Sequence, residues 1–209
     1  NKTSNGYGNI DDEKSYQIVS DIDMTLLKTS TQFPEHECVT RIYHALNEVL
    51  IHRDNNASMM SGELYINGVK TTLIQSDGII FSTPTGSTAY NISAGGCLIS
   101  PSVPCIGITP ICPHTLSFRP VILEESSIIH IKIPHNSRYN ALVNFDGKNS
   151  TIMYKGDVLE ILKSPFPVPT FKHDSFQTEW FTSLATKFNW NVRTEQKAFD
   201  SNNNYDNSN

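Results

Sequence analysis

The amino-acid sequence predicts a mainly β protein of layered antiparallel sheets, with a short helix after a glycine-rich turn and an amphipathic helix near the carboxyl end. Two observations carry this prediction. Short runs of β-branched and other apolar residues recur along the chain. Dipeptides typical of tight turns separate them, above all Asn67-Gly68 and Asp146-Gly147. Short strands joined by such turns favour hairpins over alternating β-α units.

The composition divides the chain into four segments. Residues 1–40 form a polar lead-in that we expect to be partly disordered, and residues 41–173 form the β-rich domain. Residues 174–193 contain a carboxy-terminal helix, and residues 194–209 form a low-complexity tail that we expect to be disordered. A chain of 209 residues has room for one good-sized domain with tails.

The predicted strands follow one another at short intervals. The first runs from Ile42 to His52 with apolar residues on both faces, and Leu64–Ile66 and Val69–Ile74 flank the Asn67-Gly68 turn. Gly78–Ser82 is an apolar run beside a turn-forming Asp-Gly pair. Further strands are predicted at Cys105–Thr109, Ile128–Ile133, Ala141–Phe145 and Val158–Leu162.

Between Asp77 and Gly96 a strand, a turn of small residues and a helix follow in succession. Thr83-Pro84-Thr85-Gly86 cannot easily continue the strand, because proline lacks an amide donor and fixes its φ angle. Ser87–Ala94 predicts a short helix that Gly95-Gly96 ends. Such a helix start presents backbone amides and hydroxyl groups to an anion or a polar ligand.

A second helix is predicted near the carboxyl end, with Asp174 or Ser175 as its N-cap. Its apolar residues share one stripe, made of Phe176, Trp180, Phe181, Leu184 and Phe188. The stripe packs either on its own domain or, given its large aromatic area, on another domain outside this chain. In the second case we expect it to be only partly covered.

The composition also excludes some classes of function. The net charge of −5 and the pI of about 5.8 argue against a nucleic-acid-binding surface, which needs a basic face. No apolar run is long enough to cross a bilayer and no secretory signal is visible, so we expect a cytoplasmic protein without a membrane partner. The cysteines form no Cys-x-x-Cys pair, which favours reduced thiols over a zinc site; they are Cys38, Cys97, Cys105 and Cys112.

Three polar features are suited to binding a ligand. Asn47-Glu48 places an amide beside a carboxylate, and because adjacent strand residues point to opposite faces, one ligand meets both only at a strand end or an irregularity. Asp77 is expected beside the helix start, where helix amides stabilise an acidic group. Asp146 belongs to a predicted hairpin tip. Taken alone, each of the three also has a purely structural interpretation.

The residues of these motifs, in this order, resemble those of one protein family. Asp77-Gly78 followed by Ser82–Tyr90, which reads Ser-Thr-Pro-Thr-Gly-Ser-Thr-Ala-Tyr, is similar to the glycine-rich signature of NAD kinases. That family also carries an Asn-Glu pair ahead of the signature and a Phe-Asp-Gly motif after it, as in Asn47-Glu48 and Phe145–Gly147. Two further segments resemble the family, Ile108–Pro120 and His173–Phe176, and the whole resemblance covers residues 42–193.

The resemblance implies a fold, a reaction and a set of binding residues. Residues 41–173 would be the family's β-rich, NAD-binding domain, in an enzyme that transfers the γ-phosphoryl group of ATP, bound with Mg²⁺, to the 2′-hydroxyl of the adenosine ribose of NAD to give NADP. NAD would lie between this domain and an amino-terminal domain that also receives the terminal helix, in a homo-oligomer (a dimer or tetramer). The positions that match the family's NAD site are Asn47, Glu48, Asp77, Thr85, Thr88, Ala89, Tyr90 and Asp146.

One family motif does not occur in the sequence. This is Gly-Gly-Asp-Gly, which belongs to the family's amino-terminal α/β domain and whose aspartate is taken as the catalytic base, so no catalytic residue and no metal ligand is assigned here. The sequence is interpreted as the carboxy-terminal portion of an NAD kinase that is inactive alone. Two alternatives stay open: a non-catalytic dinucleotide-binding or regulatory module, and a structural oligomerisation domain, which would leave the wording of Asn47-Glu48 and Thr85–Tyr90 unexplained.

Overall fold

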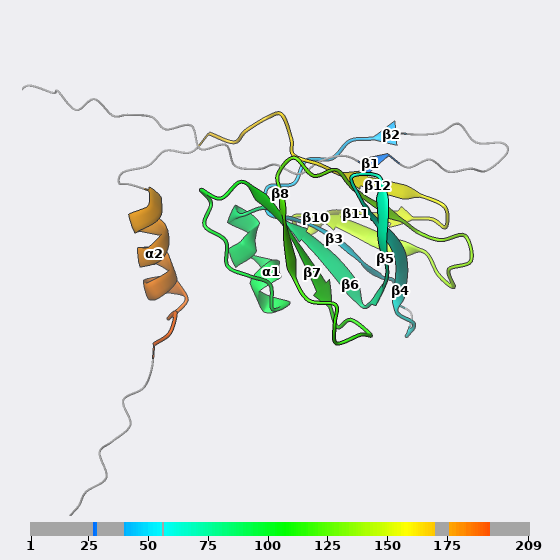
Figure 1. Ribbon diagram of the computed structural model, residues 1–209, viewed down its shortest axis with the longest axis horizontal. Coiled ribbons are helices and arrows are strands. Elements are labelled where there is room, and N and C mark those ends of the chain that lie inside the picture. Colours follow the sequence, from blue (N-terminus) through cyan, green and yellow to red (C-terminus); the bar gives the residue numbers. More distant parts are fainter. Residues whose placement is uncertain (1–26, 29–39, 56, 170–175, 193–209) are drawn as a thin grey trace, which may run out of the picture. The chain divides into compact units, whose positions relative to one another are not determined.

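The computed structural model describes residues 27–28, 40–55, 57–169 and 176–192 (Figure 1). They belong to two units, Asn1–Lys172 with the strands and His173–Asn209 with one helix. Nearly all of the predicted lead-in, the predicted tail, Cys38 and the predicted N-cap lie outside the described residues. Within the described ranges, no helix is long and apolar enough to cross a membrane.

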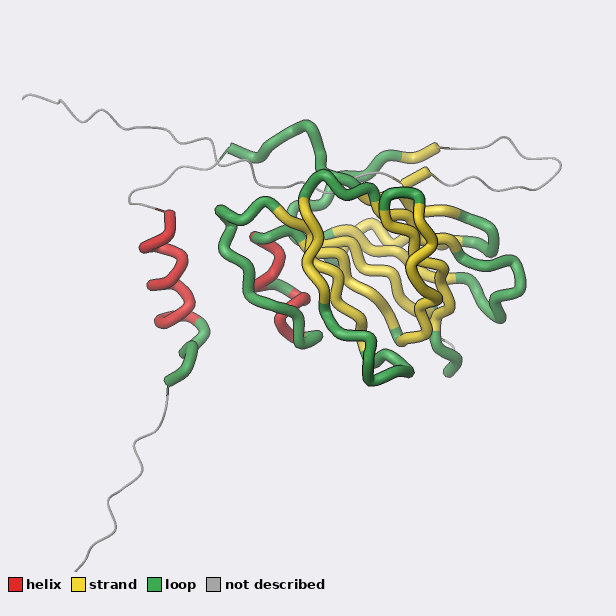
Figure 2. Tube along the Cα trace, viewed as in Figure 1, coloured by secondary structure: helices red, strands yellow, loops and turns green. Residues whose placement is uncertain are grey.

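The larger sheet has six antiparallel strands in the order β11-β10-β3-β6-β7-β8 (Figures 1 and 2). They are β3 (Glu48–Arg53), β6 (Gly78–Ser82), β7 (Cys105–Ile111), β8 (Val121–Glu124), β10 (Ala141–Phe145) and β11 (Lys148–Met153). The β6 residues are all buried, as a short continuous apolar run predicts. Glu48 at the start of β3 pairs with Ser82 at the end of β6. The loop that precedes β3 and the loop that follows β6 therefore lie at the same end of the sheet's strands.

The smaller sheet has four antiparallel strands in the order β12-β9-β4-β5. They are β4 (Met60–Ile66), β5 (Val69–Ser76), β9 (Ile129–Lys132) and β12 (Val158–Ile161). Asn67 and Gly68 join β4 to β5 with φ angles of 50° and 79°, the left-handed conformation that a two-residue hairpin turn requires. A separate two-residue pair joins β1 (Leu27–Lys28) to β2 (Thr40–Arg41).

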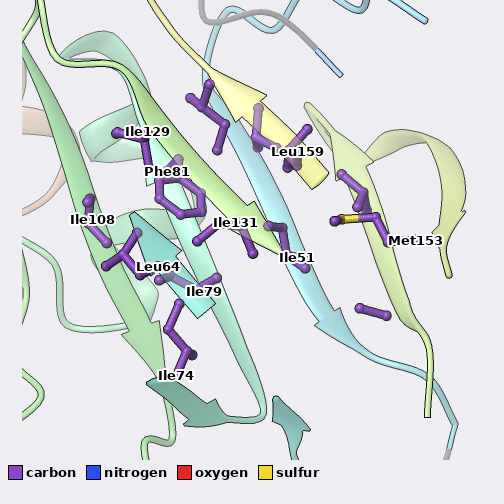
Figure 3. Close-up of a cluster of buried hydrophobic side chains, with 14 of the residues drawn as sticks. Ile51, Leu64, Ile74, Ile79, Phe81, Ile108, Ile129, Ile131, Met153 and Leu159 are labelled. Atoms are coloured by element: carbon purple, nitrogen blue, oxygen red, sulfur yellow. The ribbon is translucent and has the colours of Figure 1, made fainter. Parts of the chain in front are cut away.

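The two sheets contribute to one apolar core (Figure 3). Ile51 and Phe81 enter it from the larger sheet, and Leu64 and Ile131 enter it from the smaller one. Burial of a side chain of this size contributes roughly 1.5–3 kcal/mol relative to leaving it exposed. Because strand residues alternate, the neighbours of Ile51 in β3 point to the opposite face of the larger sheet.

The mainly β, layered antiparallel fold predicted from the sequence is confirmed. β6 and β10 have the predicted bounds, Gly78–Ser82 and Ala141–Phe145, whereas β8 and β11 were not predicted. The first predicted strand is wrong in its first half, because the amides of residues 46–48 donate to a side chain instead of a neighbouring strand. Ile42 and Leu46 are consequently outside the core, with exposed fractions of 61% and 39%.

The helix predicted over Ser87–Ala94 is divided in two. A 3₁₀ turn, η1 (Thr85–Thr88), precedes one α-helical turn, α1 (Tyr90–Ser93). Ala89, at φ −88° and ψ −130°, interrupts the helical geometry between them. Gly95 follows at φ 80°, which confirms the predicted helix stop.

The predicted terminal helix is present as α2 (Phe176–Lys187). On its stripe, Trp180 is partly exposed with its ring edge-on to Phe181, and Phe181 and Phe188 are exposed. Leu184 is the buried member of the stripe, at the point where the chain turns back and the Trp190 amide donates to the Leu184 carbonyl, so the described part of the stripe is covered only in part, as expected. The packing of this stripe on another domain stays a prediction.

Candidate functional site

Thr83 joins the glycine-rich turn to the segment before β3. Its amide donates to the Asn47 carbonyl at 2.9 Å, and its hydroxyl donates to the Leu46 carbonyl at 2.7 Å. The same hydroxyl accepts the Gly86 amide at 2.9 Å. Because Thr83 is fully buried, these bonds form away from water and fix the turn against the Asn47 backbone.

Gly86 is the closest point of that contact. A Cβ built on this residue would overlap the backbone carbonyl of Asn47, so only glycine fits there. The requirement comes from a close approach of two backbones, since Gly86 is not at positive φ. The glycine of this turn therefore has a packing reason beside any ligand contact.

Ser87 and Asn91 fasten the other side of the turn. The Ser87 hydroxyl donates to the Ile99 carbonyl at 3.1 Å and accepts the Ile99 amide at 2.9 Å. The Asn91 amide group donates to the carbonyls of Ser87 and Cys97, and its oxygen accepts the Thr109 hydroxyl at 2.6 Å. Sequence reasoning assigned no role to either residue, although short polar side chains inside a helical segment often bond the backbone.

Asp146 holds the Asn47-Glu48 pair in place from the turn between β10 and β11. Its carboxylate accepts the amides of Leu46 and Asn47 at 2.7 Å each and that of Glu48 at 3.1 Å. Asp146 has a φ of 49° and Gly147 a φ of 68°, the tight hairpin tip that the sequence predicts. The aspartate is thus committed to three backbone donors, and its role in the geometry is to position its neighbours.

Glu48 is the most perturbed acid of the site. It is 7% exposed, and burial, with a smaller contribution from the Asp146 carboxylate, raises the pKa of its side chain. The Tyr90 amide donates to this carboxylate and opposes the rise in pKa. Its Oε2 atom is buried without a hydrogen-bond partner in the described part of the chain. A ligand hydroxyl or amine could supply that partner.

A cleft of about 770 Å³ lies over the outer face of the larger sheet. Its floor contains alternate residues of β3, namely Glu48, Leu50 and His52, with Asn144 of the neighbouring β10. Tyr90 and Gly147 border it beside Glu48. The opposite end is formed by Arg53, Asp54, Asn55, Asp77 and Ile111.

Asp77 lies at the opposite end from the helix start. All of β6 separates it from Thr85, which at roughly 3.3 Å per residue is more than 15 Å. The expectation that helix amides stabilise its carboxylate is therefore wrong, because β6 leads the chain away from Asp77 before η1 begins. Its partner is Arg53, whose Nε lies 2.9 Å from Asp77 Oδ1, and both side chains are partly exposed.

A family model described as the ATP-NAD kinase C-terminal domain matches residues 46–173. The chain belongs to the ATP-NAD kinase family. ATP-NADH kinase YEF1 of Saccharomyces cerevisiae is 50% identical over 157 residues, which are 75% of this chain and 31% of that protein. The NAD(+) kinase of the same yeast is 46% identical over 157 residues, 75% of this chain and 29% of that protein. The chain spans about a third of the length of these relatives.

Two solved structures share the fold. The crystal structure of yeast NADH kinase complexed with NADH has a TM-score of 0.75 and 29% identity, covering 85% of this chain and 50% of that one. An NAD kinase from Archaeoglobus fulgidus in complex with ATP has a TM-score of 0.63 and 27% identity, covering 78% of this chain and 59% of that one. This chain is thus the carboxy-terminal, β-rich portion of an ATP-NAD kinase family member.

The residues that match the family's NAD site occupy three places in the structure. Glu48, Asp77 and Tyr90 line the cleft directly. Asn47 and Asp146 belong to the framework that holds Glu48, and no lining atom comes from either. The remaining three, Thr85, Thr88 and Ala89, lie in the turn beside Tyr90; the Thr88 hydroxyl donates to the Thr85 carbonyl at 3.2 Å. Sequence reasoning did not find the lining residues His52, Arg53 and Asn144.

Some residues with familiar chemistry take no part in this site. In the ranges that the structure describes, no group of three or more His, Cys, Asp or Glu residues is arranged to hold a metal ion. Cys97, Cys105 and Cys112 are free thiols. His114, to which the sequence assigned no role, donates its amide to the Gln75 carbonyl.

Proposed function

We propose that the protein to which this chain belongs is an NAD kinase that phosphorylates the 2′-hydroxyl of the adenosine ribose of NAD, with ATP and Mg²⁺ as the phosphoryl donor, and so makes NADP. This chain supplies most of the NAD site. The main support for this proposal is the buried set of hydrogen bonds that joins the turn at Thr83 and Gly86 to the backbone of Asn47-Glu48. Beside it lies the Oε2 atom of Glu48, which has no partner in the described part of the chain. Family membership supports the reaction.

The residues of this chain act by binding and orientation. Glu48 accepts a hydrogen bond from a ribose hydroxyl or a base amine, Asp77 does the same at the other end, and Tyr90 closes the near side of the cleft. Positioning the acceptor hydroxyl, together with neutralising charge, supplies most of the catalysis of phosphoryl transfer. No described residue is assigned to Mg²⁺, which would arrive with ATP.

The activity test uses the 209-residue chain with NAD, ATP and Mg²⁺, and follows NADP with a coupled dehydrogenase. We expect no turnover, because the Gly-Gly-Asp-Gly motif does not occur in this sequence. The same chain with the family's amino-terminal domain fused ahead of it should be active. Turnover of the order of 1–100 per second by the chain alone would contradict the assignment of the catalytic base elsewhere.

The binding test separates this proposal from a structural module. Calorimetric titration with NAD should show binding that weakens by about 1–3 kcal/mol in Asn47→Ala and Asp77→Ala, once circular dichroism confirms their folding. Glu125→Ala is a control, because Glu125 pairs with Lys163 and does not line the cleft. Folded variants that bind like the parent would remove these residues from the site.

The same proposal includes the setting of the enzyme. We expect a homo-oligomer, a dimer or tetramer, because two edge strands expose apolar residues that a second copy could cover: Val69 and Leu73 on β5, and Val121 and Ile122 on β8. Light scattering of the purified chain checks this. The free thiols support a cytoplasmic location.

A further inference from the structure

His52 and Asn144 form a hydrogen-bonded pair on the cleft floor, and neither is among the residues that match the family's NAD site. His52 Nδ1 lies 2.8 Å from the Arg53 carbonyl oxygen, which can only accept, so Nδ1 carries the ring hydrogen. In the neutral ring His52 Nε2 is then an acceptor, and the Asn144 atom 3.0 Å away from it is the Nδ2 donor. The backbone of Arg53 therefore fixes the orientation of the Asn144 amide through the imidazole ring.

This orientation leaves half of the Asn144 amide for a ligand. Oδ1 and the second N–H of Asn144 have no other hydrogen-bond partner in the described part of the chain, and the residue lines the cleft. Asn144 pairs with Leu50 across β10 and β3, so its side chain stands on the same face as those of Leu50 and His52. The free donor and acceptor thus lie between the Glu48 end and the Asp77 end of the cleft.

A donor beside an acceptor, both fixed in direction, is suited to a planar group with the complementary pair. An asparagine amide makes such a two-bond contact with the amino group and ring nitrogen of adenine. A carboxamide, as in nicotinamide, offers the same pair of one N–H donor and one oxygen acceptor. The neighbouring Leu50 adds an apolar surface on which a flat ring can lie.

We propose that Asn144, oriented by His52, is a specificity-determining residue that reads the amide-like edge of one ring of the dinucleotide. The inference rests on the proposed function and deepens it, because it names a contact within the same cleft. Two rings share the required chemistry, the adenine and the nicotinamide carboxamide. His52 acts as a positioning residue, since both of its nitrogens are already engaged.

The test compares three dinucleotides in calorimetric titrations of the whole chain. NAD is compared with nicotinic acid adenine dinucleotide, in which a carboxylate replaces the carboxamide, and with nicotinamide hypoxanthine dinucleotide, in which a carbonyl replaces the adenine amine. The unaltered chain should bind one of the two analogues about five- to one-hundred-fold more weakly than NAD, the range for a bidentate contact. The analogue that loses affinity identifies the ring.

The variants test whether Asn144 causes that discrimination. Asn144→Leu should bind NAD and the disfavoured analogue equally. His52→Phe, which keeps a ring but no longer orients the Asn144 amide, should lose part of the ratio between the affinities for NAD and for that analogue. Asn140→Leu is the matched control, because Asn140 likewise makes one side-chain hydrogen bond, in which its oxygen accepts the Lys155 amide, and it does not line the cleft. Should Asn144→Leu fail to fold, Asn144→Ser removes the same two-bond edge with a smaller side chain.

The possible results separate the two proposals. If the affinity ratio between NAD and the disfavoured analogue is lost in Asn144→Leu and kept in Asn140→Leu, Asn144 is supported as the specificity-determining residue. Folded Asn144 variants that keep the parent ratio overturn it and leave the proposed function intact, as does a parent chain that binds all three dinucleotides equally. If the parent binds none of the three, the proposed function of this chain and the inference built on it both fail.

Discussion

The two ends of the cleft are built in different ways. At the Glu48 end, the buried side chains of Thr83 and Ser87 fix the backbone, and the partly buried Asp146 accepts three amides. At the Asp77 end, the Arg53–Asp77 ion pair joins two side chains that are 37% and 39% exposed. One end is held by a network of hydrogen bonds that is largely buried, and the other by a charge pair in contact with water. The first should be rigid and costly to alter, and the second adjustable.

The largest expected effect is at Gly86. Gly86→Ala places a methyl group on the Asn47 carbonyl, and because both partners are backbone, the turn must move as a whole. We expect a loss of about 3 kcal/mol or more in the free energy of unfolding, measured with urea, and loss of NAD binding. Gly62→Ala is the control, since its Cβ would meet only ordinary contacts and should cost far less. Equal losses in the two variants would mean that the turn is not packed as described.

The next effect is at Asp146. Asp146→Ala leaves the amides of residues 46–48 without their acceptor, so we expect a loss of about 2–3 kcal/mol, and a smaller loss for Asp146→Asn. Asp54→Asn is the matched control, because the Asp54 carboxylate accepts one exposed amide, that of Asn55. Urea unfolding measures both. An Asp146→Ala variant as stable as Asp54→Asn would show that the clamp does not hold the Glu48 end together.

A pH dependence provides a third test of the buried end. The pKa of Glu48 lies above its ordinary value of 4.5 in the folded chain, mainly because of burial, so the folded state holds the proton more tightly than the unfolded state. Glu48 therefore stabilises the folded state at a pH below its ordinary pKa of 4.5. This contribution to stability is lost as the pH rises through the higher pKa of the folded state. Glu48→Gln should gain stability relative to the parent as the pH rises above 4.5, while losing affinity for NAD.

Glu63 provides a control of opposite sign. A hydrogen bond from Lys70 lowers the pKa of this partly exposed carboxyl group, so its contribution to stability is present above the ordinary pKa and is lost as the pH falls. Glu63→Gln should accordingly lose a little stability relative to the parent at neutral pH, and the difference should vanish in acid. Unfolding curves recorded between pH 3 and 8, roughly, compare both variants. The same sign for both would mean that burial does not distinguish Glu48.

The difference between the two ends also decides what the sequence could predict. β6 and β10 could be predicted because their apolar runs satisfy their own backbone in a regular ladder. The path of residues 42–47 could not be predicted, because the Leu46 and Asn47 amides donate to Asp146, about a hundred residues away along the chain. The position of Asp77 was also wrong, since a motif that is contiguous in sequence is divided by the whole length of β6. The motifs named candidate site residues, of which Glu48, Asp77 and Tyr90 line the cleft, and strand register decides which end of the cleft each of them occupies.

The smallest expected effect is at Arg53–Asp77. In a double-mutant cycle with Arg53→Met and Asp77→Asn, the coupling energy should be below about 1 kcal/mol, because exposed ion pairs are screened by water. It should fall further in 1 M salt, where the Debye length is about 3 Å. Lys163–Glu125, at 2.7 Å and with 33% and 31% of its side chains exposed, is the matched pair outside the cleft and should give a similar value. NAD distinguishes them: saturating ligand should change the coupling of Arg53 with Asp77 alone, because only these residues line the cleft. A coupling energy between Arg53 and Asp77 above about 2 kcal/mol that salt does not reduce would mean that the Asp77 end is as rigid as the Glu48 end. The contrast between the two ends would then fail.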